Sequence, residues 1–202
     1  MSRYFLHVFF AALFLLSAPA KAEIEAYDFD KVHTQIFFTV SHLGFSESTG
    51  QFLDFDGELN LDHADPAKSG VDVTIKTSSL EMNHDKWNEH LKNADFFNVE
   101  KFPTMTFKST NVTVTGDHTA DVTGDLTILG ITKPVVLKVV HNKTDKHPFS
   151  GKMATGFSAT AMVKRSDFGM GYGLPAVGDD VHIRITVEAT RQGDDQPVGQ
   201  NQ

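Results

Sequence analysis

Apolar and polar side chains alternate through most of this 202-residue chain, and the alternation limits the possible folds more than any other feature. It is clearest in residues 181–188, where Val or Ile occupies every second position. A period of two is typical of a β-strand that buries one face. Roughly eight to ten such runs follow one another without a strand–helix–strand rhythm. We therefore expect an all-β fold with an antiparallel sheet, arranged as a sandwich or a barrel.

The details of the strand pattern give three further expectations. Residues 50–61 read as one long segment that bends where the alternation slips, between Phe52 and Phe55. Pro134 reads as the beginning of a strand, where its missing N–H is tolerated. Residues 142–150 read as a loop.

Residues 84–109 interrupt the alternation. Trp87 and Leu91 are four positions apart, which places both side chains on one face of a helix. Three phenylalanines follow before Pro103, where the alternation resumes. We expect a short helix and an aromatic cluster between two sets of strands.

The first 22 residues have the features of a signal peptide. Arg3 precedes an apolar run at 8–16 that is too short to span a bilayer as a helix. Ala20-Lys21-Ala22 fits a cleavage site, so we expect an exported, periplasmic protein that begins at Glu23 and has no membrane-spanning segment. A membrane anchor is the alternative. Residues 192–202 read as a disordered tail, which leaves a single domain at 23–191.

Charge and composition exclude several classes of function. The formal charge of −8 becomes −10 when Arg3 and Lys21 leave with the leader, which disfavours nucleic acid and anionic lipid surfaces as partners. The absence of cysteine excludes thiol catalysis, cysteine-ligated zinc and iron–sulfur sites. The histidines are scattered, and His84 and His90 fall on different sides of a helix, so we expect no metal site.

Candidate catalytic groups are few. Residues 156–160 (Gly-Phe-Ser-Ala-Thr) approach a nucleophile elbow but lack its last glycine and lie in a strand pattern. His42 continues an inward apolar stripe, so it is either a hydrogen-bonded histidine at a barrel rim or a polar anchor for a ligand head group. An enzyme would need an acid–base pair, and His42 with Asp54 or Asp167 is the only pairing that we can nominate. We expect no catalytic activity.

Several ordered motifs resemble the YceI-like family of exported lipid-binding proteins. They are His33-x-x-Ile-x-Phe-x-Val-x-His42-Leu-Gly-Phe45, Gly50-x-Phe52-x-x-Phe55-Asp-Gly57, His90-Leu-Lys-Asn-Ala-Asp-Phe-Phe97, Lys101-Phe-Pro-Thr-Met-Thr-Phe-Lys-Ser109, Gly124-Asp-Leu-Thr-Ile-Leu-Gly-Ile-Thr-Lys-Pro134 and Ser166-Asp-Phe168. The resemblance covers residues 27–189. It implies an extended, lipocalin-like antiparallel barrel with one short helix. Its interior would hold a polyisoprenoid, a quinone-like tail or a fatty amide, with no other cofactor.

One position departs from the family pattern. Family members commonly have Arg-Asp between the two histidines, whereas this chain has Trp87-Asn88. The loss of that arginine makes a diphosphate head group less favoured and a neutral quinone or amide more favoured.

The resulting hypothesis is an exported, non-enzymatic carrier or sequestering protein for a long apolar lipid. The alternatives are a structural or stress-response module with a filled barrel, and a lipid-modifying enzyme. An exposed strand edge or cavity mouth could support a homodimer. The residues predicted to contact the ligand are Ile36, Phe38, Val40, His42, Phe52, Val73, Ile75, Trp87, Met105, Phe107, Leu126, Ile128, Phe157, Ile183 and Ile185.

Overall fold

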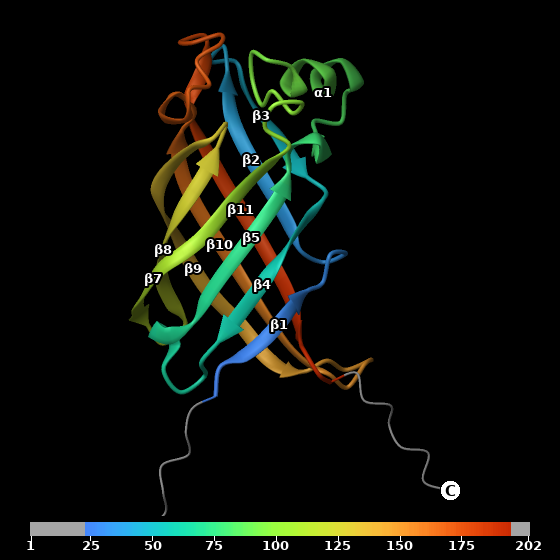
Figure 1. Cartoon of the computed structure of the whole chain (residues 1–202), viewed down its shortest axis with the longest axis vertical. Coiled ribbons are helices and arrows are strands. Elements are labelled where there is room, and N and C mark those ends of the chain that lie inside the picture. Colours follow the sequence, from blue (N-terminus) through green and yellow to red (C-terminus); the bar gives the residue numbers. More distant parts are fainter. Residues whose placement is uncertain (1–22, 195–202) are drawn as a thin grey trace, which may run out of the picture.

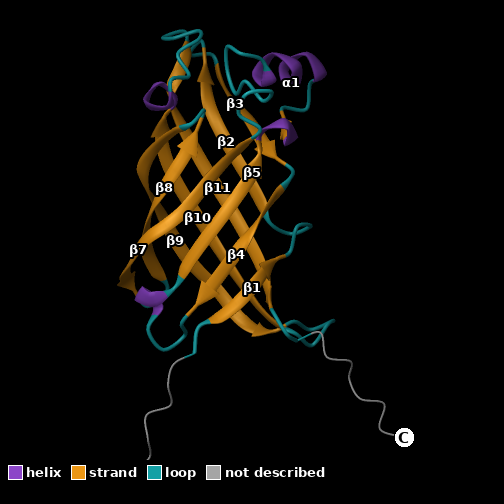
Figure 2. Cartoon of the chain, in the orientation of Figure 1, coloured by secondary structure: helices purple, strands orange, loops and turns teal. Residues whose placement is uncertain are grey.

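Eleven strands and one short helix make up residues 23–194, the part of the chain that the computed structural model describes. Figures 1 and 2 show the strands wrapped into an elongated barrel, with the helix at one end and the two ends of the described chain at the other. The strands are β1 (Glu25–Phe29), β2 (Gln35–His42), β3 (Ser46–Phe52), β4 (Phe55–Leu61), β5 (Gly70–Lys76), β6 (Leu80–Glu81), β7 (Thr104–Gly116), β8 (Thr119–Ile128), β9 (Ile131–Lys146), β10 (Met153–Lys164) and β11 (Val177–Arg191). The helix is α1 (Asp85–Lys92), and short 3-10 turns lie at Pro66–Lys68, Thr77–Ser79 and Arg165–Phe168.

The strand order closes an antiparallel barrel. Eight strands form the ring in the order β1-β4-β5-β7-β8-β9-β10-β11, and β11 pairs back with β1. Strand β11 is long enough to pair with β2 through its first part and with β1 near its end, so β2, β3 and β6 extend the sheet beside the helix. The all-β barrel with one short helix, which the family resemblance implied, is confirmed.

Three local predictions were wrong. Residues 50–61 are two strands, because the slip in alternation marks a change of partner: β3 pairs with β2, whereas β4 pairs with β1 and β5. Strand β9 continues through 142–146, where polar residues face partners on β10. Pro134 lies inside β9, opposite Asp125 of β8.

The expectations at the chain ends have a mixed outcome. The signal peptide at 1–22 lies outside the described residues, as does the tail from 195 onward. Residues 192–194 of the predicted tail are described: the backbone N–H of Gln192 donates to the carbonyl of Ala26, and Asp194 accepts a hydrogen bond from the backbone N–H of Met153. No helix within 23–194 has the length and apolar character needed to cross a membrane.

Close packing on the barrel wall depends on a glycine in β8. A β-carbon at position 124 would lie 2.4 Å from Cζ of Phe107 and 2.7 Å from the carbonyl oxygen of Lys108. The Phe107 ring therefore occupies the space that a side chain at 124 would take. Gly156 in β10 is different, because a β-carbon there would meet nothing closer than 3.6 Å.

These two glycines give a matched test of the wall packing. We expect Gly124→Ala to lower the free energy of unfolding by about 1–3 kcal/mol, because the ring of Phe107 or the backbone of β7 must move. Gly156→Ala should leave the free energy of unfolding within about 0.5 kcal/mol of the wild type. Urea unfolding monitored by circular dichroism measures both, and equal stability of the two variants would contradict this account.

Candidate functional site

The barrel encloses a cavity of about 970 Å³ whose walls are mostly aliphatic and aromatic. The inward residues of the alternating strands form these walls, since each strand turns every second side chain toward the axis. The cavity reaches from Trp87 at the helix end to His63 and His118 at the opposite end. All fifteen residues predicted to contact a ligand line it, although contact with a ligand remains a prediction.

Aromatic rings cover the helix end of the cavity. Trp87, which is 44% exposed, packs against His42 at 6.1 Å and His84 at 5.9 Å between ring centroids. Next to it, His90 and Tyr172 make edge contacts with each other and with the buried ring of Phe96. The helix and the aromatic cluster predicted from the sequence therefore lie together at one end of the barrel.

Asn88 fixes the helix to the barrel. Its side-chain oxygen accepts a hydrogen bond from the backbone N–H of Met82 at 2.7 Å, and its amide nitrogen donates to both carboxylate oxygens of Glu81 at 3.0 Å. The hydrogen bond from Asn88 is the main reason that the pKa of Glu81 lies below its ordinary value. An aspartate at 88 would place a second carboxylate against Glu81, so asparagine suits this chain.

A buried arginine shapes the loop at the same end. Arg165 is 6% exposed, and its guanidinium donates hydrogen bonds to the carbonyls of Gly178, Met170, Tyr172 and Val177 at 2.7–3.0 Å. Burial lowers the pKa of Arg165. Sequence reasoning missed this residue because its partners are backbone oxygens, which leave no pattern of side chains.

The nominated acid–base pairs do not form. Asp54 bonds to Lys76 at 2.6 Å, Asp167 is exposed, and neither carboxylate lines the cavity. His42 does line the cavity, where its ring packs against Trp87.

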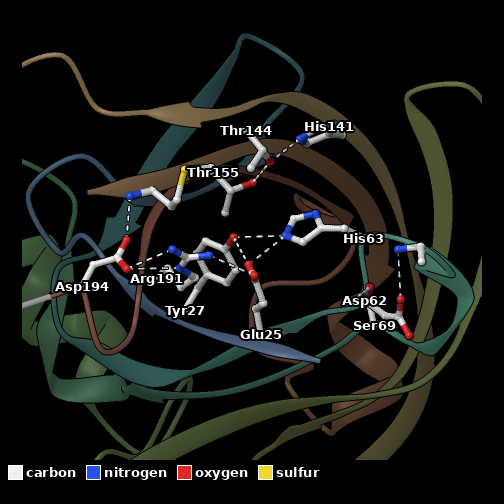
Figure 3. Close-up of polar contacts among 12 residues, drawn as sticks. Glu25, Tyr27, Asp62, His63, Ser69, His141, Thr144, Thr155, Arg191 and Asp194 are labelled. Atoms are coloured by element: carbon white, nitrogen blue, oxygen red, sulfur yellow. Dashed lines mark hydrogen bonds and ion pairs between the residues drawn. The ribbon is translucent and has the colours of Figure 1, made fainter. Parts of the chain in front are cut away.

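A polar network occupies the end opposite the helix (Figure 3). The hydroxyl of Tyr27, a fully buried residue, donates to Glu25 at 2.9 Å, and Nε2 of His63 lies 3.1 Å from that hydroxyl and 3.2 Å from the Glu25 carboxylate. Arg191 donates to Glu25 at 2.9 Å and to Asp194 at 3.0 Å. Burial raises the pKa of Glu25, but the hydrogen bonds from Tyr27 and Arg191 outweigh it and hold that pKa below its ordinary value.

A second polar chain crosses the neighbouring strands. Nε2 of His141 lies 2.8 Å from the Thr144 hydroxyl, which lies 2.8 Å from the hydroxyl of Thr155. A β-bulge opposite Gly156 and Phe157 shifts the parity of β9, so that His141 and Thr144 both line the cavity. Burial, followed by the nearby His118 and His63, lowers the pKa of His141. These residues were missed because 142–150 read as a loop.

Metal-binding side chains meet at one place among residues 23–194. Donor atoms of Asp30, His33 and Glu188 lie within 4.8 Å of one another, and none of these residues lines the cavity. Asp30 already accepts hydrogen bonds from the backbone N–H groups of Val32 and His33 and contacts His33 Nδ1 at 2.8 Å. This local turn accounts for the contacts between Asp30 and His33, whereas Glu188 comes from β11 and also lies 3.8 Å from Nε2 of His147.

Comparison with known proteins decides the family. The sequence-family model described as the YceI-like domain matches residues 27–189. The chain belongs to the YceI-like family. Protein YceI of Escherichia coli O6:H1 (strain CFT073) is 38% identical over 192 residues, which cover 95% of this chain and 100% of that relative.

Two solved structures share the YceI-like fold at lower identity. The crystal structure of Burkholderia cenocepacia BcnA matches with a TM-score of 0.74 and 24% identity, covering 81% of this chain and 100% of BcnA. A polyisoprenoid binding domain from Saccharophagus degradans matches with a TM-score of 0.63 and 13% identity, covering 83% of this chain and 99% of that domain.

The buried tyrosine of this YceI-like barrel gives a pH-dependent prediction. Burial, with a contribution from Glu25, raises the pKa of Tyr27 from 10.0 to about 12. Because the folded state holds this proton more tightly, the stabilisation is complete below pH 10 and is lost as the pH rises from 10 to about 12. Tyr27→Phe should lose about 1–3 kcal/mol at neutral pH and should lack this component of the alkaline decline.

Urea unfolding at a series of pH values measures the decline. Tyr172→Phe is the matched control, because it removes the hydroxyl of a half-exposed tyrosine at the helix end, and we expect it to keep the wild-type profile. Identical alkaline profiles for Tyr27→Phe and the wild type would contradict the prediction.

Proposed function

We propose that this YceI-like protein is an exported carrier or sequestering protein that binds a long apolar lipid inside its barrel, without catalysing a reaction. The observation that carries the proposal is the apolar cavity of about 970 Å³ that reaches from the helix end to the opposite end. Ligand pockets usually measure roughly 300–1,000 Å³, so this cavity is at the upper end of the range. The signal-peptide features of residues 1–22 support export to the periplasm.

The chemistry of the wall favours a chain over a compact polar molecule. Aliphatic and aromatic side chains offer burial and dispersion along the whole axis but few directional hydrogen bonds. Each buried methylene contributes about 0.8 kcal/mol, so a long chain can bind tightly while similar chains are poorly distinguished. The printed name of the Saccharophagus degradans domain supports a polyisoprenoid as the ligand class, and a quinone tail or a fatty amide fits the same wall.

The two rival functions have less support. A module with a filled barrel does not match a cavity of this volume. A lipid-modifying enzyme would need an acid–base pair on the wall, and neither Asp54 nor Asp167 reaches the cavity that His42 lines. Association into a homodimer stays a prediction.

The first test is the lipid content of the protein. We expect the protein isolated from its native host to carry an extractable long-chain lipid, because apolar burial makes dissociation into water unfavourable. Native mass spectrometry, with lipid extraction and reconstitution by an added polyprenol or quinone, measures this. Protein that carries no lipid and takes up neither compound would rule out the proposal.

The second test compares substitutions at two neighbouring residues of β10, one that lines the cavity and one that is exposed. Ala159 is buried and lines the cavity, whereas Thr160 beside it is exposed. We expect Ala159→Phe to lower lipid affinity about tenfold or more, since the ring takes the space of at least two methylenes of the lipid. Thr160→Phe is the matched control and should bind as the wild type does. A fluorescent-lipid titration measures both, and equal affinities would contradict binding inside the barrel.

A further inference from the structure

Charged residues on the cavity wall are separated by sign. The acidic residues among those that line it, Asp62 and Asp117, lie at the end opposite the helix, together with His63, His118 and His141. The basic residues, Lys86 and Arg165, lie at the helix end. An amphiphile inside the barrel would therefore meet two chemically different ends.

Asp62 is the most unusual of these residues. It is 3% exposed and lines the cavity. Its Oδ1 accepts hydrogen bonds from the backbone N–H groups of Ala64 at 3.0 Å and Asp65 at 2.8 Å. Within residues 23–194, no hydrogen bond reaches its other oxygen, Oδ2. No fully buried side-chain oxygen in this part of the chain lacks a partner, so Oδ2 is accessible from the cavity, where a ligand that donates a hydrogen bond can reach it.

Nearby cations are already engaged elsewhere. Arg191 pairs with Glu25 and Asp194. Lys68, on the same loop as Asp62, pairs with Asp65 at 3.1 Å and is largely exposed. Neither of these two cations forms an ion pair or a hydrogen bond with Asp62 itself.

The side chains around Asp62 add further acceptors. Nε2 of His63 lies within hydrogen-bond distance of the Tyr27 hydroxyl and of the Glu25 carboxylate, which adds a second carboxylate near this end (Figure 3). The hydroxyl of Thr144 also lines the cavity and can accept or donate. This end is rich in hydrogen-bond acceptors and acidic residues. It therefore favours a lipid head group that donates hydrogen bonds and disfavours an anionic one.

We propose that the end of the cavity opposite α1 is a head-group site for a lipid whose head donates hydrogen bonds and is uncharged or cationic, with Asp62 Oδ2 as the principal acceptor. Long-chain amines, primary amides and alcohols belong to this class. The inference rests on the proposed lipid-binding function and adds the head-group chemistry and the orientation of the ligand. The head lies beside Asp62, and the chain runs toward α1.

The test compares lipids that share one chain, namely tetradecylamine, tetradecanol and tetradecanoate, each by displacement of N-phenyl-1-naphthylamine at neutral pH. Asp62→Asn keeps the oxygen that accepts from Ala64 and Asp65 and replaces Oδ2 with an NH₂ donor. We expect it to weaken tetradecylamine about tenfold, a loss of about 1.4 kcal/mol. Tetradecanoate should bind as well or better, because the variant removes a negative charge and offers an NH₂ donor at the same place.

Glu58→Gln is the matched control, because it removes one negative charge from an exposed residue of β4, near Asp62 in the chain, that does not line the cavity. We expect it to bind all three lipids as the wild type does. If Asp62→Asn leaves the affinity for tetradecylamine unchanged, or if Glu58→Gln weakens it equally, the head-group site is wrong and lipid binding stands. If the wild type binds none of the three, the proposed function fails and the inference fails with it.

Discussion

The pairing of β11 with three neighbours is the interaction on which the rest of the structure depends. This strand bonds to β10 along most of its length, to β2 through its first part and to β1 at its end. The ring of eight strands closes only through the contact between β1 and β11. Closure satisfies the backbone groups that an open sheet edge would expose. The wall can therefore hold its shape without side chains filling the interior.

The volume of the cavity shows why the wall must hold its shape without a filled interior. Cavities made by truncating core side chains cost about 24 cal/mol per Å³, and at that rate 970 Å³ would cost about 23 kcal/mol. That exceeds the roughly 5–15 kcal/mol of stability that a typical domain has. A space of this volume is therefore not a packing defect. Filling it with an apolar lipid chain lowers the free energy, because the chain and the wall are removed from water.

The part of this site that the sequence predicts depends on local patterns, and the part that it misses depends on contacts between residues far apart in the chain. Alternation is local, so it correctly placed Ile36, Phe107 and the other predicted wall residues on the inner face. The polar end depends on contacts that are distant in the chain: His63 meets Tyr27 across 36 positions. At His141 a bulge breaks the parity on which alternation relies. A periodic pattern cannot report contacts of either kind. The sequence alone therefore predicted the apolar interior of the barrel and missed the polar residues at the end opposite α1.

The proposed head-group site also implies the direction in which a lipid enters. Exposed side chains line both ends, His63 and His118 at the far end and Lys86 and Trp87 at the helix end, so exposure does not separate the two. A lipid whose head rests beside Asp62 must enter tail first through the far end, because moving a polar head along the apolar wall would strip its hydration without replacing the lost hydrogen bonds. The tail then meets the aromatic cluster. In this arrangement α1 contributes the Trp87 ring that the tail meets, and no contact with the head is required of its Lys86, which lines the same end.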